Sequence, residues 1–501
     1  MKKSVSSLIL IIYMALSAAA QDYREIIRNN PAWAASNLYQ YVYAETEDTP
    51  VPKGFRPFYI NHYGRHGSRY MSSGLETERV RPIFEAADSS GILTEAGRLF
   101  WKDLRAVLDE QDGAVGMLTV RGAEEHRGMG ERMARRFPAV FKGRKTINCI
   151  SSTSPRCLLS MTCFTDALQD NTEGLDFSYM TGERYYAYLA YHPEVEEGLV
   201  LSGDLEMAFR RAESDPEALL EYFFTDIEKA IGLTGDPYVF ERRLYQLACV
   251  GQLTDYGKCL LEHFPEELLV KNWEARNARF YTAYSNSKEL PHYASEVAAP
   301  LVNEIVKQVD AALEEGSDVA ADLSFGHDVT LMPLISHMGI DGMHEKLSFD
   351  EVNGKWNSSD FICMGSNIQF IFYRNKTGDV IVRILYNEKE TTIPGLKSLY
   401  GPYYSWLNSG RISLISDNQF YSQLFDPLSG FLGDSAVCDE DIDFFNFTYS
   451  GKASLADLAR VAQDNLGLGR LHHLFGDPCL FTCAAGQAVF EVYAVHTEEY
   501  F

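Results

Sequence analysis

The sequence FYINHYGRHGSRY, residues Phe58–Tyr70, joins an apolar run to a cluster of cationic side chains. The run Phe58–Tyr63 has the composition of a buried strand. After it, His66 lies between two arginines, and glycines flank the Arg-His pair. Arginine offers phosphate oxygens a planar fork of donors, histidine can be a nucleophile, and glycine lets the backbone approach an anion. The stretch predicts a phosphate-handling loop at a strand end; the alternative is a solvated basic loop.

Two other runs place polar residues directly after strand-like segments. Residues 145–153 are followed by Arg156, within the sequence SSTSPRCLLS, and the segment Asp318–Phe325 is followed by Gly-His-Asp. In open α/β sheets, ligands bind outside the carboxyl ends of the strands. The sequence therefore predicts that six residues share one pocket: Arg65, His66, Arg69, Arg156, His327 and Asp328.

Hydrophobic periodicity predicts an α/β core at residues 55–165 and 291–400, and we expect it to have three layers, αβα. The segment 166–290 loses the strand pattern and mixes acidic with aromatic residues, which favours an inserted helical cap. Its expected helices are Asp215–Ile231 and Pro237–Leu253. The core is expected to contain a strand at 55–63, helices over Thr94–Asp109, Ala123–Phe137, Tyr293–Glu315 and Val329–Gly339, and a hairpin of Ile368–Arg374 with Val380–Asn387.

Residues 405–501 continue neither pattern and form a C-terminal extension without an assigned role. A helix is expected over Leu455–Leu466 and a strand over Ala488–Val495. The pair His472-His473 in this extension receives no function.

The N-terminal residues 1–20 have the layout of a secretory signal peptide. Lys2 and Lys3 precede the apolar run Leu8–Leu16, and Ala18–Ala20 offers a small-residue cleavage site. Cleavage would change the formal net charge from -25 to -27, since it removes two lysines and no acids. We expect an extracytoplasmic protein, periplasmic or secreted, without a membrane span.

The strongly acidic composition argues against nucleic acid as a partner, because no basic stripe runs along the chain. An acidic protein that binds phosphate must concentrate its positive charge locally, which makes the arginine cluster more informative. The nine cysteines form no set with zinc-site spacing, and their odd number leaves at least one unpaired within the chain. Cys149 is expected to be a buried apolar residue.

These motifs resemble those of the histidine acid phosphatases, the large branch of the histidine phosphatases, and in particular the multiple inositol polyphosphate phosphatases and phytases. The first motif, R-H-G-x-R-Y, is at Arg65–Tyr70, and the second arginine region is at Ser151–Ser160. The run Ser324–Gly339 is similar to the third motif, and Val382–Glu388 to a late strand. The likeness extends over residues 55–400.

The resemblance implies a phosphoric monoester hydrolase with a phosphohistidine intermediate on His66. Asp328 would protonate the leaving alcohol, a role worth ~10²–10⁴-fold in rate. The phosphoryl oxygens would be held by Arg65, Arg69, Arg156 and His327, which suits the charge that develops in phosphoryl transfer. No metal or other cofactor is expected, because the arginines supply the positive charge.

Some residues depart from the family pattern, and for others the sequence supports more than one role. The inositol polyphosphate phosphatases often have His-Ala-Glu where this chain has His327-Asp328, and Met71 with Ser72 replaces the usual Pro-Thr. His126 is interpreted as a surface or packing histidine. For Arg79 and Arg81, contact with a second phosphate and a solvated position remain alternatives.

The leading hypothesis is a secreted phosphomonoesterase that acts on small-molecule inositol polyphosphates such as phytate. A broad-specificity acid phosphatase or a sugar-phosphate phosphatase would use the same machinery. An inactive phosphate-binding protein is the alternative from another class, and the intact His66 and Asp328 argue against it. Phosphoglycerate mutase chemistry needs a cytosolic substrate, which the signal peptide argues against. The oligomeric state stays open.

Overall fold

The computed structural model describes residues 23–190, 195–394 and 396–406, with short strands at 448–449, 483–484 and 487–489. The chain divides into two compact units, Met1–Leu414 and Ile415–Phe501. The described part of the second unit is a small sheet of order β10-β11-β9, formed by Cys483–Ala484, Gln487–Val489 and Thr448–Tyr449. The predicted signal peptide, the predicted helix Leu455–Leu466 and most of the predicted strand Ala488–Val495 lie outside the described residues.

An eight-stranded mixed sheet forms the centre of the first unit, in the order β3-β2-β4-β1-β5-β6-β7, with β8 paired to β6. Strands β3, β2, β4 and β1 are parallel, and the pairs from β1–β5 onward are antiparallel. The strands are β1 (Arg56–Arg65), β2 (Lys145–Ser151), β3 (Leu175–Thr181), β4 (Val319–Gly326), β5 (Asn367–Arg374), β6 (Val380–Tyr386), β7 (Lys389–Glu390) and β8 (Tyr403–Ser405).

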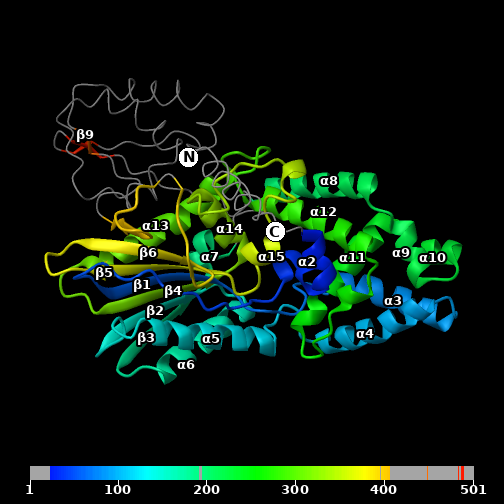
Figure 1. Ribbon diagram of the computed structural model, residues 1–501, viewed down its shortest axis with the longest axis horizontal. Helices are drawn as coiled ribbons and strands as arrows, with labels where there is room; N and C mark the ends of the chain where they lie inside the picture. Colours follow the sequence, from blue (N-terminus) through cyan, green and yellow to red (C-terminus); the bar gives the residue numbers. More distant parts are fainter. Residues whose placement is uncertain are drawn as a thin grey trace, which may run out of the picture. The chain divides into compact units, whose positions relative to one another are not determined.

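Helices cover both faces of this sheet, which confirms the predicted three-layer α/β class. Helices α5 (Val120–Arg136) and α6 (Pro155–Asp170) lie together on one face, and α13 (Tyr293–Leu313) with α14 (Asp328–His337) lies on the other (Figure 1). Buried side chains of α5, α6 and the strands form one continuous apolar cluster. Burial of this apolar surface is the main force that holds the layers together.

A second apolar cluster organises a helical lobe beside the sheet (Figure 1). The lobe consists of α2 (Tyr23–Asn29), the 3-10 segment η1 (Pro31–Leu38), α3 (Leu75–Ser89), α4 (Glu95–Gln111), α8 (Val195–Glu213), α9 (Pro216–Phe223), α10 (Ile227–Thr234), α11 (Pro237–Val250) and α12 (Glu266–Tyr284). Shorter elements are η2 (Glu183–Tyr185), α7 (Tyr186–Leu189), η3 (Gly251–Leu253), η4 (Leu260–His263), η5 (Phe349–Glu351) and α15 (Ser358–Phe361).

The lobe differs from the predicted cap in two ways. Strand β3 lies within residues 166–290 but belongs to the sheet, where it pairs with β2. The predicted helix Thr94–Asp109, which corresponds to α4, and the residues of α3 were placed in the core, yet buried residues such as Phe84 and Phe100 pack into the cluster of the lobe. The prediction failed because β3 is an edge strand without a fully buried side chain, and because the helical pattern of α4 does not reveal which layer it contacts.

The predicted helix Asp215–Ile231 is in fact two helices. The side chain of Asp215 accepts a hydrogen bond from Ala218 N and starts α9, and that of Asp226 accepts from Lys229 N and starts α10. Each aspartate satisfies an amide at a helix N-terminus that would otherwise have no partner. The second cap explains the break, which periodicity alone did not indicate.

Candidate active site

The parallel register brings the ends of three strands to one level. Arg65, the last residue of β1, is paired with Gly326 of β4, and Ser151 of β2 is paired with Phe325. The chain then leaves each strand at the same edge, where His66 N donates to Gly326 O at 3.0 Å. The predicted convergence of the three motifs is therefore a property of the sheet register.

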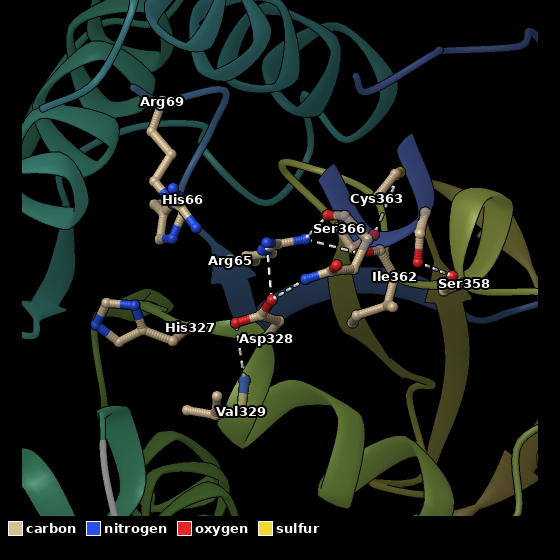
Figure 2. Close-up of polar contacts among 12 residues, drawn as sticks. Arg65, His66, Arg69, His327, Asp328, Val329, Ser358, Ile362, Cys363 and Ser366 are labelled. Atoms are coloured by element: carbon tan, nitrogen blue, oxygen red, sulfur yellow. Dashed lines mark hydrogen bonds and ion pairs between the residues drawn. The ribbon is translucent and has the colours of Figure 1, made fainter. Parts of the chain in front are cut away.

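A cavity of about 400 Å³ opens at this edge, between the sheet and the helical lobe. Its lining includes five of the six predicted residues: His66, Arg69, Arg156, His327 and Asp328. The sixth, Arg65, is fully buried beside the cavity, and its guanidinium is 2.7 Å from the carboxylate of Asp328. Figure 2 shows the guanidinium of Arg65 next to the carboxylate of Asp328, to which a dashed line joins it.

The loop after β1 is held by residues from α5 and α6. Glu125 accepts hydrogen bonds from both the backbone N and Oγ of Ser68, each at 2.7 Å. Ser160 Oγ accepts from Gly67 N at 3.1 Å. Burial raises the pKa of Glu125, although the hydrogen bonds from Ser68 act in the opposite direction. These contacts fix the backbone that presents His66 and Arg69.

We expect Gly67→Ala to lower the stability of the protein by about 2 kcal/mol and to reduce activity. A Cβ at this position would lie 2.5 Å from the backbone oxygen of Gly122 in α5, and neither backbone can move without disturbing the loop. Urea unfolding would measure the loss. Gly203→Ala is the matched control, because a Cβ there meets no atom within 4 Å and alanine favours a helix. An unchanged urea midpoint for Gly67→Ala would contradict the expected clash with Gly122.

His66 has a ring nitrogen free for chemistry. Its Nδ1 is 2.9 Å from Gly67 O, and a carbonyl oxygen only accepts, so Nδ1 carries the hydrogen and Nε2 keeps its lone pair. Burial holds the pKa of His66 well below its usual value, and the nearby guanidinium groups of Arg156 and Arg65 add to the effect. Both effects favour the neutral imidazole, which is the form that a nitrogen nucleophile requires.

Two of the arginines around His66, Arg69 and Arg156, form no ion pair with a carboxylate in the part of the chain that the structure describes. Arg69 Nη1 donates to Tyr70 O at 2.8 Å, and Arg156 Nη1 contacts Gly116 O at 3.4 Å. Within the described residues, the buried Nε atoms of both arginines have no hydrogen-bond acceptor. Burial lowers the pKa of Arg69 and of Arg156, and repulsion from Arg65 adds to the effect on both, as repulsion from Arg156 does on Arg69. A bound anion would relieve both the repulsion and the missing hydrogen bonds.

His327 and Asp328 form the opposite side of the site. The rings of His327 and His66 meet edge to face with centroids 5.4 Å apart. Arg156 Nη2 is 3.4 Å from His327 Nδ1, which must accept, so the hydrogen of His327 is on Nε2, 3.1 Å from Ser152 Oγ. Burial lowers the pKa of His327 to about 3, so this ring is a neutral donor.

Asp328 forms an ion pair with Arg65, which favours the ionised carboxylate. One carboxylate oxygen, Oδ2, contacts Arg65 Nη2 at 2.7 Å and accepts from Asn37 Nδ2 at 2.9 Å, while Oδ1 accepts from Val329 N at 3.1 Å. Burial alone would raise the pKa of Asp328, but Arg65 and the Asn37 hydrogen bond outweigh it and the pKa is lowered. The group can act as an acid once a bound anion offsets Arg65.

The structure shows the surroundings of the histidine and the two arginines whose roles the sequence did not decide. His126 is fully buried in α5 against Phe325, which is the packing interpretation, and burial lowers its pKa to about 3. Arg81 pairs with two acidic residues of the α4 end, and Arg79 is exposed on α3; the cavity lining includes neither. The pair His472-His473 lies outside the described residues.

Cys149 is buried as expected, and it is a free thiol, as are Cys157, Cys163, Cys249, Cys259 and Cys363. The described ranges contain no helix that is long and apolar enough to cross a bilayer. Residues 1–22 are not among them.

Asn37, Arg276 and Arg279 line the cavity and were not predicted as site residues from the sequence. Asn37 comes from η1, and Arg276 and Arg279 come from α12. None of them belongs to a strand-end motif. An arginine spacing of three on a helix places both side chains on one face, but nothing in the sequence indicates that this face meets the cavity.

Comparisons with known proteins find similarity to the histidine phosphatases. The sequence model of the histidine phosphatase superfamily, branch 2, matches residues 254–387. The chain is 23% identical over 367 residues to multiple inositol polyphosphate phosphatase 1 of Gallus gallus, a match that covers 68% of this chain and 78% of the relative.

Solved structures share the fold. A multiple inositol polyphosphate phosphatase of Bifidobacterium longum, in complex with inositol hexasulfate, aligns with a TM-score of 0.62 at 18% identity and covers 77% of this chain and 98% of that one. The phytase from D. castellii aligns with a TM-score of 0.56 at 14% identity and covers 79% and 84%. These comparisons agree with the resemblance to the histidine acid phosphatases, and the predicted enzyme class, phosphoric monoester hydrolase, is confirmed.

Proposed function

We propose that this protein hydrolyses inositol polyphosphates such as phytate through a phosphohistidine on His66. The observation that carries the proposal is the neutral imidazole of His66, whose free Nε2 lies in a cavity with unmatched arginine charge on one side and Asp328 on the other. Preorganised cations of this kind stabilise the charge on a transferring phosphoryl group.

In the first step, Nε2 of His66 attacks phosphorus and the bond to the ester oxygen breaks. The leaving alkoxide takes a proton from Asp328, which acquires that proton when the substrate dianion offsets Arg65 and raises its pKa. Arg69 and Arg156 donate to the phosphoryl oxygens, and His327 joins them once its Nε2 hydrogen turns from Ser152 Oγ to the phosphate. In the second step, water attacks the phosphohistidine, so inorganic phosphate is released and His66 is regenerated.

The helical lobe supports a substrate with several phosphates. Arg276 and Arg279 are separated in the sequence from the strand-end motifs, but they line the same cavity. Arg279 shares the buried carboxylate of Glu206 with Arg210 and Arg242, so three guanidinium groups surround one acid. Positive charge therefore extends beyond what a single phosphate needs, and a polyanionic ester would match it.

A phosphate-release assay with phytate and p-nitrophenyl phosphate tests the substrate class. We expect a higher kcat/KM for phytate, and Arg279→Ala should raise the KM for phytate about tenfold while it changes the KM for p-nitrophenyl phosphate little. Arg211→Ala is the matched control, because Arg211 makes an exposed ion pair with Asp236. Equal hydrolysis of the two esters would instead indicate a broad-specificity acid phosphatase.

We also propose that the enzyme acts outside the cytoplasm. Support comes from the basic, apolar and small-residue regions of residues 1–20, which match a secretory signal. Phosphate esters such as phytate would then be met in the periplasm or in the surroundings of the cell.

A further inference from the structure

The side chain of Asn37 connects the two halves of the site. Its Nδ2 donates to Asp328 Oδ2 at 2.9 Å, and its Oδ1 accepts from Arg276 at 3.1 Å (Nε) and 2.8 Å (Nη2). Its backbone oxygen accepts from Arg65 Nη1 at 2.6 Å. One residue of η1 therefore contacts the carboxylate of the proposed acid, the arginine that pairs with that acid, and an arginine of the helical lobe.

The chemistry of these partners fixes the orientation of the amide. A guanidinium only donates, so the oxygen of Asn37 must face Arg276 and its NH₂ must face Asp328. A donor at this place favours the ionised form of Asp328. Because Asn37 and Arg65 share Oδ2, the other oxygen, whose one hydrogen bond in the described ranges comes from Val329 N, is the place for a proton.

The backbone holds Asn37 in this position at a conformational cost. The preceding residue, Ser36, has φ 59° and ψ -134°, a left-handed region that residues other than glycine rarely adopt. Its Oγ is 2.5 Å from Ser358 Oγ, and both residues are fully buried. Asn37 is itself only 5% exposed, although it lines the cavity. Backbone strain of this kind persists where surrounding contacts enforce it, and it is common at functional sites.

We propose that Asn37 is a positioning residue that sets the protonation range of Asp328 by donating to its carboxylate. The proposal rests on the proposed function, in which Asp328 protonates the leaving group. Removal of the donor should raise the pKa of Asp328 in the free enzyme. Asp328 would then remain protonated to higher pH. The pH profile of kcat/KM reports groups of the free enzyme, so its alkaline limb should move to higher pH.

Asn37→Asp is the decisive variant. It keeps the size of the side chain and an oxygen acceptor for Arg276, but it replaces the donor toward Asp328 with a carboxylate. Two carboxylates at this distance raise the pKa of one of them. With an alkyl phosphate as substrate, we expect the alkaline limb of kcat/KM to move upward by about one pH unit or more. Asn37→Ala should produce a shift in the same direction that is no larger.

A structural role for Asn37 predicts the opposite order, in which Asn37→Asp resembles the wild type and Asn37→Ala is the damaged protein. Superimposable wild-type and Asn37→Asp profiles would overturn the proposal. Asn30→Ala, an exposed asparagine just before η1, serves as the control and should leave the profile unchanged. Urea midpoints and inhibition by inorganic phosphate would show that the variants are folded and bind the anion.

The leaving group separates this proposal from the proposed function. The shift should be large with an alkyl phosphate and small with p-nitrophenyl phosphate, whose phenolate leaves without help from an acid. A wild-type protein without phosphatase activity would refute the proposed function. Normal activity with a profile insensitive to Asn37→Asp would refute only the role of Asn37.

Discussion

Replacement of His66 by alanine should lower kcat for phosphate release by about 10⁴-fold or more, with both phytate and p-nitrophenyl phosphate. The reason is that Nε2 of His66 is the atom that would form the bond to phosphorus, and alanine offers no substitute. Rapid quenching in base, in which phosphohistidine survives, should trap phosphorylated wild-type protein and none of the variant. Release of phosphate by steady-state assay gives the size of the loss.

The control for this experiment is His344→Ala, because His344 is exposed. It should retain wild-type activity and phosphoenzyme. Substitution of a buried residue next to Arg156 and Arg65 can also change stability, so both variants require an unfolding curve. If folded His66→Ala kept its activity, the phosphohistidine mechanism would be wrong. Loss of turnover with intact binding of inorganic phosphate would instead support it.

Asp328→Asn should reduce kcat/KM by ~10²–10⁴-fold for phytate and other alkyl esters, and far less for p-nitrophenyl phosphate. An alkoxide is a poor leaving group and needs the proton, whereas p-nitrophenolate is stable without it. The amide also keeps the shape of the carboxylate beside Arg65 and Asn37. Measurement of both substrates on one preparation gives the ratio directly.

An equal reduction of kcat/KM for the two substrates would show that Asp328 acts only through the ion pair with Arg65 and does not protonate the leaving group. Asp379→Asn is a suitable control, since Asp379 is an exposed carboxylate in the turn between β5 and β6. The sign of the pH dependence provides a second check. His66 keeps its lone pair at low pH, because its pKa is lowered. Asp328 loses its proton as pH rises and can then no longer protonate the leaving group. Wild-type activity on alkyl esters should therefore decline on the alkaline side.

Much of the fold was predictable because strong local signals agreed with the tertiary structure. The apolar run before Arg65 is a central strand, buried from both sides by helices, and such strands appear in a sequence as continuous apolar segments. Helix α4 begins where Thr94 caps it, close to the predicted start. The edge strand β3 was missed, because its side chains alternate between partial burial and exposure and resemble a surface segment.

The sequence by itself determined the chemical groups at the strand ends. Each strand-end motif is a short continuous stretch of sequence, so its residues can be recognised locally. Parallel strands of one sheet end at the same edge, and this general rule predicts that His66, Arg156 and His327 meet there. Only the tertiary structure decided what surrounds them. Asn37 and Arg276 are 239 residues apart, yet they share hydrogen bonds. Such contacts depend on how the helical lobe packs against the sheet, and no local pattern in the sequence encodes that packing.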